Sequence, residues 1–186
     1  MTDILNAKLI AGELQDKWAW ILVFGIIFLV LGITGLGMTF FLTKLVALYV
    51  GFLIIIGGIS QLILSFATKG WRGTIFSILI GILYLIVGIE IIANPAVASE
   101  FLTLLLAITI IVIGISRIIL ALTLRPLLNW LWTLIGGLIT VLLGIMILSR
   151  WPDSGLWVIG LFIAIEMIVN GWSLITVALA AKATKA

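Results

Sequence analysis

Six long runs of apolar residues are the feature that most limits how this chain can fold. They cover residues 18–37, 45–66, 75–93, 101–124, 131–148 and 156–181 of the 186-residue sequence. Each is close to the roughly 20 residues with which a helix crosses a bilayer. Lipid offers the backbone no hydrogen-bond partners, so such runs must be helices or strands of a closed barrel. Barrel strands alternate apolar and polar residues, and these runs do not. The sequence therefore predicts an all-α membrane protein with six transmembrane helices.

Short polar or Gly/Pro-containing segments separate the runs and are predicted to be turns, at residues 43–44, 69–73, 94–100, 125–129 and 150–155. The composition, 65% hydrophobic and 9% charged, excludes a soluble domain. The chain has no Cys and no His, which excludes disulfides, zinc sites with the usual ligands and histidine proton switches. A formal charge of +3 is too small and too dispersed for a nucleic-acid partner. We predict no catalytic, cofactor-binding or metal-binding residues, and hence no enzyme.

The basic residues predict the orientation of the spans. Eight of the ten Lys and Arg residues fall on one side of the predicted membrane: Lys8, Lys17, Lys69, Arg72, Arg117, Arg125, Lys182 and Lys185. Only Lys44 and Arg150 fall on the other. Because basic residues concentrate in cytoplasmic loops, both termini are predicted to be cytoplasmic.

The termini are predicted to lie outside the bundle of residues 18–181. Residues 1–17 form an N-terminal segment in which Ile4, Ala7, Ala11 and Leu14 make one helical stripe. A short helix on the membrane interface suits this stripe, and a frayed tail is the alternative. Residues 182–186 are predicted to be a cytoplasmic tail.

The chain repeats itself at a regular interval. In the odd-numbered spans, Gly25 and Gly32 recur as Gly81 and Gly88 and then as Gly137 and Gly144, with a step of 56 each time. The even-numbered spans follow with Gly51/Gly58, Ala107/Gly114 and Ala164/Gly171, the last step being 57. We therefore predict three tandem helical hairpins of the same topology, approximately 18–69, 70–125 and 126–181.

The spacing of the repeated small residues predicts what they do. Seven residues turn a helix through about 700°, so two residues seven apart share a face about 10.5 Å apart. Helices in lipid associate by close packing at small residues. We interpret these glycines as helix-packing contacts: Gly25, Gly32, Gly51, Gly58, Gly81, Gly88, Gly114, Gly137, Gly144 and Gly171. A pore lining is the less favoured interpretation, because a water-filled lumen needs a polar stripe.

Residues 18–181 resemble the HdeD family of small bacterial inner-membrane proteins, which are built from a repeated two-helix unit. The resemblance rests on the two glycines seven apart in the odd spans, on the turn Ala93-Asn94-Pro95, and on the segments 114–117 and 165–166. It implies a multi-pass protein of the bacterial inner membrane with a role in acid resistance or envelope stress. It implies no catalytic or ligand-binding residue.

Two ionisable residues lie inside predicted spans. Arg117 lies near the cytoplasmic end of the fourth span, where its side chain can snorkel to the headgroups. Glu166 lies close to the middle of the sixth span, with Asn170 one turn later, and Thr109 is its counterpart in the fourth span. We expect the Glu166 carboxyl to be protonated and to donate a hydrogen bond between helices. A proton-relay or substrate-binding role is the alternative.

These observations support several functions. The first is a non-enzymatic, HdeD-like membrane protein that protects the envelope under acid stress. The second is an accessory subunit of a larger membrane complex, and a homo-oligomer is also open. The third, a proton-coupled transporter using Glu166, is less favoured because tandem repeats of one topology differ from the inverted repeats of transporters. Membrane lipids are the expected partners in every case.

Overall fold

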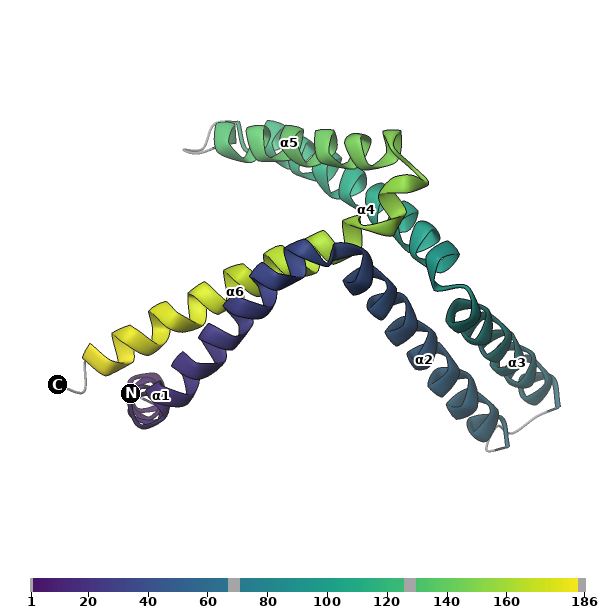
Figure 1. The fold of residues 1–186 in the computed structure, drawn as a ribbon, viewed down its shortest axis with the longest axis horizontal. Helices are drawn as coiled ribbons and strands as arrows, with labels where there is room; N and C mark the ends of the chain where they lie inside the picture. The colour runs from purple at the N-terminus through teal and green to yellow at the C-terminus, as the bar shows by residue number, and fades with distance from the viewer. Residues whose placement is uncertain (1, 67–70, 126–129, 184–186) are drawn as a thin grey trace. The chain divides into compact units, whose positions relative to one another are not determined.

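A computed structural model describes residues 2–66, 71–125 and 130–183, of which residues 2–16 and 72 by their backbone alone. The described residues form six α-helices and one short 3-10 helix, and no strand occurs among them (Figure 1). The elements are α1 Thr2–Gly37, α2 Thr39–Ser65, α3 Trp71–Ala93, α4 Pro95–Thr123, α5 Trp130–Ser149, η1 Asp153–Leu156 and α6 Val158–Ala183. Each of the six α-helices contains a stretch long and apolar enough to cross a membrane. The predicted all-α class is confirmed.

The helices extend beyond the apolar runs, so two predicted turns were wrong, and the predicted turn at 69–73 is shortened because α3 already begins at Trp71. The rest of that turn, and residues 126–129 of the predicted turn at 125–129, lie outside the described residues. Thr43 and Lys44 lie inside α2, and the predicted turn at 94–100 is reduced to Asn94, because Pro95 already starts α4. Polar residues at the end of a span continue the helix into the interface, where hydropathy no longer marks it. The N-terminal segment from Thr2 is helical and continuous with the first span. Whether it lies on the interface stays a prediction.

A single residue joins the two helices of each of the first two repeats, whereas residues 150–157, including η1, join α5 to α6. Met38 separates α1 from α2, Asn94 separates α3 from α4, and α5 ends just before Arg150. These three positions follow one another at the step of the glycine series, so the interruption belongs to the repeat. At Asn94 the backbone (φ −128°, ψ 63°) leaves the helix, yet its N–H donates to the Glu90 carbonyl at 2.9 Å. Proline next to it removes a backbone donor and fixes the start of α4. We refer to this end of the helices, near residues 38, 94 and 150, as the break end.

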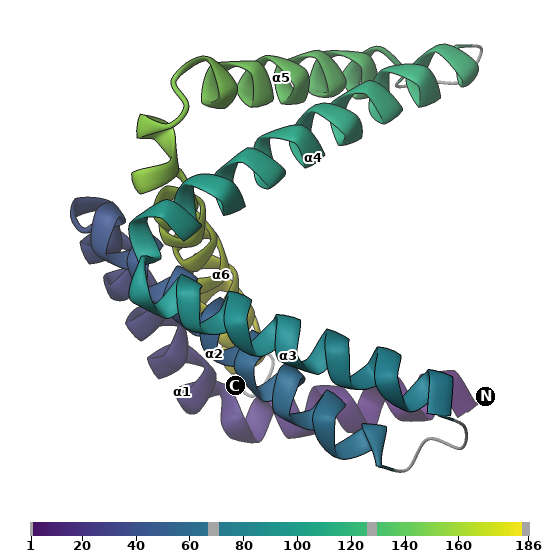
Figure 2. The same ribbon diagram turned by 90° about the vertical axis from the view of Figure 1, so that its right-hand side faces the viewer.

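The helices that pack tightly belong to different repeats. The chain forms two compact units, one with α1 and α6 and the other with α2 to α5 and η1. In the first unit α6 lies along α1; in the second α2 lies along α3, and α4 along α5 (Figures 1 and 2). Close packing is therefore shifted by one helix relative to the repeats 18–69, 70–125 and 126–181, which remain a sequence prediction. The opposite end of each pair, near residues 66–71, 124–130 and 18/182, is called the loop end.

The three pairs cross at repeat-equivalent positions. At one crossing the partners are Gly58 and Gly81, Gly114 and Gly137, and Gly171 and Gly25. A methyl group on the first glycine of each would lie only 3.0, 3.0 and 2.8 Å from the carbonyl oxygen of the second. Farther along the helices, Gly88 meets Gly51, Gly144 meets Ala107 and Gly32 meets Ala164 in the same way. The repeat in the sequence is thus a repeat of one helix-packing geometry.

Small residues fill the contacts, and large apolar side chains point outward. Among the described residues the fully buried apolar side chains are mostly alanines, at positions 47, 107, 121, 164 and 178. Phe66, Phe76 and Trp132 are in contrast 86%, 69% and 73% exposed. A soluble protein buries such side chains, whereas a helix surrounded by lipid presents them to acyl chains. This distribution is that of a membrane protein.

Candidate functional site

Glu166 and Asn170 lie together on one exposed face of α6. The face of α6 that meets Gly25 and Gly32 of α1 includes Ala164, Ile168, Gly171 and Ile175. Glu166 and Asn170 are exposed and belong to another face of the helix. Among the residues that the structure describes, the Glu166 carboxyl has no hydrogen-bond or ion-pair partner. The interhelical hydrogen bond of Glu166 stays a prediction.

Thr109 and Ser116 of α4 form hydrogen bonds within their own helix. The hydroxyl of Thr109 donates to the Leu105 carbonyl at 2.8 Å, and that of Ser116 to the Val112 carbonyl at 2.8 Å. Both side chains are exposed, as is Arg117, and the described part of the chain offers that guanidinium no acidic partner. A hydroxyl that bonds to a carbonyl of its own helix satisfies its donor without a partner on another helix.

All ten glycines predicted to pack helices lie buried where two helices meet. Sequence reasoning missed that the contact continues by a further seven positions, to Ser65, Ala121 and Ala178, all of which are buried. The signal was present, because these residues extend the series 51/58, 107/114 and 164/171 at the same spacing. Toward the break end, Thr43, Ala47, Ser99 and Thr103 are also fully buried. The seam between helices is therefore longer than the glycine pattern indicates.

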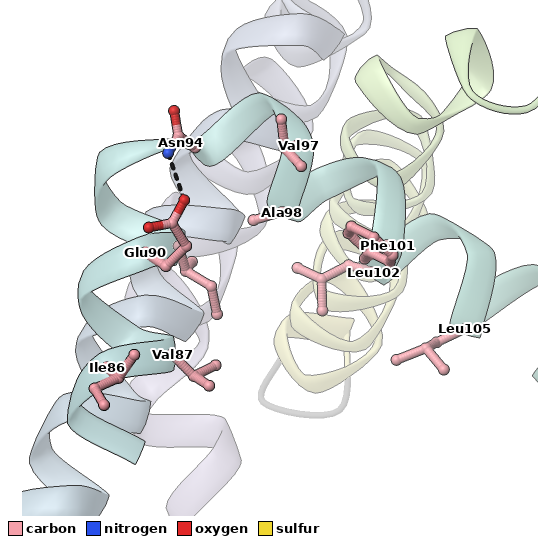
Figure 3. A pocket seen from close by; sticks show the side chains of 10 residues that line it. Ile86, Val87, Glu90, Asn94, Val97, Ala98, Phe101, Leu102 and Leu105 are labelled. Carbon is pink, nitrogen blue, oxygen red and sulfur yellow. Dashed lines mark hydrogen bonds between the residues drawn. The ribbon is translucent and has the colours of Figure 1, made fainter. Parts of the chain in front are cut away.

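A groove of about 370 Å³ lies in the bend between α3 and α4 (Figure 3). At one edge of it, the amide nitrogen of Asn94 donates to a carboxylate oxygen of Glu90 at 2.6 Å. The rest of its lining is apolar: Ile86, Val87, Ile91, Val97, Ala98, Phe101, Leu102 and Leu105. Glu90 lies in the last turn of α3, which continues to Ala93. The four-residue spacing of Glu90 and Asn94 on one helical face was the available signal for their contact.

The corner that η1 makes against α4 is closely packed. A methyl group on Gly155 would lie 2.5 Å from the Cα atom of Glu100, so only glycine fits there. The indole N–H of Trp151 donates to the Glu100 carbonyl at 3.2 Å, and the Ser154 hydroxyl to the Ile147 carbonyl at 2.8 Å. The Gly155 and Trp151 contacts hold this corner against α4, and the Ser154 hydrogen bond ties η1 to α5. Among the described residues, no three acidic side chains come together as a metal site would need.

The comparisons with known proteins agree with the repeat. The family described as "Short repeat of unknown function (DUF308)" matches residues 23–93 and again residues 79–149. The second match starts at residue 79 where the first starts at residue 23, which is the same step as in the glycines of the odd-numbered spans. No curated protein and no solved structure gives a match. Together the two matches span well over half of the sequence, and the chain belongs to the DUF308 family of short repeats.

Proposed function

We propose that this protein is a non-enzymatic, multi-pass protein of the bacterial inner membrane that protects the envelope under acid stress. The acid-stress role comes from the resemblance to HdeD, which carries the same kind of repeat. The bacterial inner membrane and cytoplasmic termini belong to the same proposal, the latter on the distribution of basic residues.

The observation that carries the proposal is where the carboxyl groups lie. The chain has no His, so Asp and Glu are the side chains through which it can respond to acid. Of the four carboxyls whose side chains the structure describes, Glu90, Glu100 and Asp153 lie at the break end of α3, α4 and α5, on or beside the bend and η1. The positive-inside rule assigns this end to the outside of the membrane. These three carboxyl groups would therefore face the compartment that acidifies first.

The test is survival of a bacterial strain from which the gene has been deleted. We expect the deletion to lower survival at low pH and the wild-type gene to restore it. A variant carrying Glu90→Gln, Glu100→Gln and Asp153→Asn should be inserted normally but restore survival poorly. Equal survival of the deletion strain and its parent at low pH would overturn the proposal.

A role as accessory subunit of a larger membrane complex is the second candidate. The exposed pair Glu166 and Asn170 favours it, because a carboxyl and an amide in the middle of a span are costly against lipid and are stabilised by a polar partner. The mass of the native protein extracted in mild detergent tests this candidate. One partner at fixed stoichiometry supports it, and a mass equal to the single chain or to a homo-oligomer contradicts it.

A further inference from the structure

Two of the closely packed helix pairs end in the same contact between a cation and a tryptophan. At the loop end of α4 and α5, the Arg125 guanidinium lies 5.5 Å from the centre of the Trp130 ring. At the loop end of α6 and α1, the Lys182 ammonium lies 4.9 Å from the centre of the Trp18 ring. Both distances are within the range of a cation–π interaction.

The two contacts occupy equivalent positions of the repeat. Arg125 and Lys182 are separated by a step of 57, the same step that separates Gly114 from Gly171. Trp18 and Trp130 are separated by two steps of 56. Arg125 and Trp130 are near neighbours in the chain, but Lys182 and Trp18 come from opposite ends of it. The recurrence is therefore a property of the helix pair, and a short connecting loop is not needed to produce it.

Each contact lies at the end of a span, where phospholipid headgroups are found. Trp18 and Trp130 are within the first residues of apolar spans, Lys182 is in the last turn of α6, and Arg125 follows α4 directly. Both cations are exposed, and both rings are partly buried. The side chains described by the structure include no acidic partner for either cation. Their positive charge is thus presented at the depth of the lipid phosphates.

The chemistry of the contact leaves the cation free to bind an anion. A ring face attracts the charge without using up its N–H donors, so the guanidinium keeps its planar fork and the ammonium keeps its donors. The guanidinium fork matches two phosphate oxygens, and the ammonium acts as a point charge. The indole ring also shields one side of the cation from water, which strengthens the attraction to an anion on the other side.

We propose that each of these two loop ends binds the phosphate group of one anionic phospholipid. Arg125 and Lys182 contact the phosphate, while Trp130 and Trp18 hold the cation in place and lie against the first carbons of the lipid. The simpler alternative is that each cation only stabilises the C-terminus of its own helix through the helix dipole. That alternative predicts a loss of stability that does not depend on the class of lipid.

Native mass spectrometry of the full-length protein in mild detergent separates these interpretations. The protein is titrated with phosphatidylglycerol and, in parallel, with phosphatidylcholine. We expect the wild type to retain two molecules of phosphatidylglycerol and to retain phosphatidylcholine weakly. Arg125→Gln and Lys182→Gln should each remove one bound molecule and weaken the affected site by about tenfold, the loss expected for a charge-assisted hydrogen bond. Arg125→Lys should keep most of the binding.

Two controls keep the experiment specific. Lys44→Gln and Arg150→Gln remove the same charge at the break end and should leave both bound molecules in place. Trp130→Leu keeps the cation and an apolar side chain but should weaken retention at that end, which tests the ring even where Arg125→Gln fails to fold. Equal binding of the two lipids, equal losses for the break-end variants, or displacement by millimolar inorganic phosphate would overturn the proposal.

Discussion

At the scale of single residues, neighbouring glycines in one helix have opposite surroundings. A methyl group on Gly137 would lie 2.9 Å from the Ile118 side chain and 3.0 Å from the Ile118 backbone nitrogen, whereas none of the surrounding atoms lies within 4 Å of one on Gly136. The sequence distinguishes the two by spacing, since only Gly137 belongs to the seven-residue series. Helix propensity favours alanine at both positions. Packing alone makes them different.

We therefore expect Gly137→Ala and Gly136→Ala to change stability in opposite directions. Gly136→Ala should raise the free energy of unfolding by up to about 1 kcal/mol, because alanine is the better helix former. Gly137→Ala should lower it by about 1–3 kcal/mol, because the backbone of α4 must move away. Thermal unfolding in detergent measures both. Melting temperatures that shift together would show that the contact between α4 and α5 is not what restricts residue 137.

Glu166 shows what sequence could and could not reveal about the candidate site. Helical periodicity places it on the same face as Asn170, and the structure agrees. Periodicity does not reveal which helix covers a given face. That depends on how the chain pairs its helices, and α6 pairs with α1 through the opposite, small-residue face. The residue was recognisable from sequence, but its surroundings were not.

Substitutions of Glu166 test the hydrogen-bonding role. Gln keeps the shape and a donor, so Glu166→Gln should leave stability and any acid-survival phenotype nearly intact. Glu166→Leu should cost about 1 kcal/mol if the carboxyl bonds to another helix, since such bonds are modest in membranes. For the stability measurement, Asp153→Asn is the control for loss of a carboxyl outside the spans, because Asp153 is exposed at the start of η1. A folded Glu166→Gln protein that fails to restore survival would favour the proton-coupled alternative.

At the scale of helices, the number and order of the elements could be predicted from hydropathy, and their pairing could not. Apolar length identifies every span, since no other structure satisfies the backbone in lipid. Hydropathy does not indicate which helices pack against each other. The tandem repeat suggested that α1 pairs with α2, yet Met38 alone separates them, as Asn94 alone separates α3 from α4. The connections from α2 to α3 and from α4 to α5 are longer, and the longest, residues 150–157, leads from α5 to α6. Two antiparallel helices need a short loop of about 2–5 residues to lie side by side, so loop length argued against pairing α1 with α2 and α3 with α4. It could not identify α1 as the partner of α6.

Cysteine cross-linking tests the pairing of α6 with α1. The chain has no Cys, so Trp18→Cys with Lys182→Cys provides the only thiols, and a short bifunctional maleimide should join them within one chain. Trp18→Cys with Phe162→Cys is the control, because Phe162 lies about 30 Å farther along α6. The mass on a denaturing gel distinguishes the products. A product of twice the chain mass would show that α1 pairs with α6 of a second copy.

At the scale of the whole molecule, the distribution of basic residues predicts the orientation in the membrane. The break end carries Lys44 and Arg150, and the other eight basic residues are assigned to the loop end and the termini. Cysteines placed at Lys8, Gly70 and Thr184 should be protected from an impermeant thiol reagent added outside, and those at Lys44 and Asp153 should react. Thr43 and Ser154 are unsuitable as labelling sites, since both are buried. The reverse pattern of labelling would contradict the orientation.

Because α1 packs against α6, the order of synthesis along the chain determines when this helix pair can form. Chains emerge from the ribosome N-terminus first, so α2 can close on α3, and α4 on α5, as soon as the second helix of each pair is made. Among these six helices, α1 is made first and its partner last. Gly25 and Gly32 therefore remain uncovered while the four helices between them and α6 are synthesised. A nascent chain arrested before α6 carries this bare strip of small residues, a surface by which quality control can distinguish an unfinished protein from a finished one.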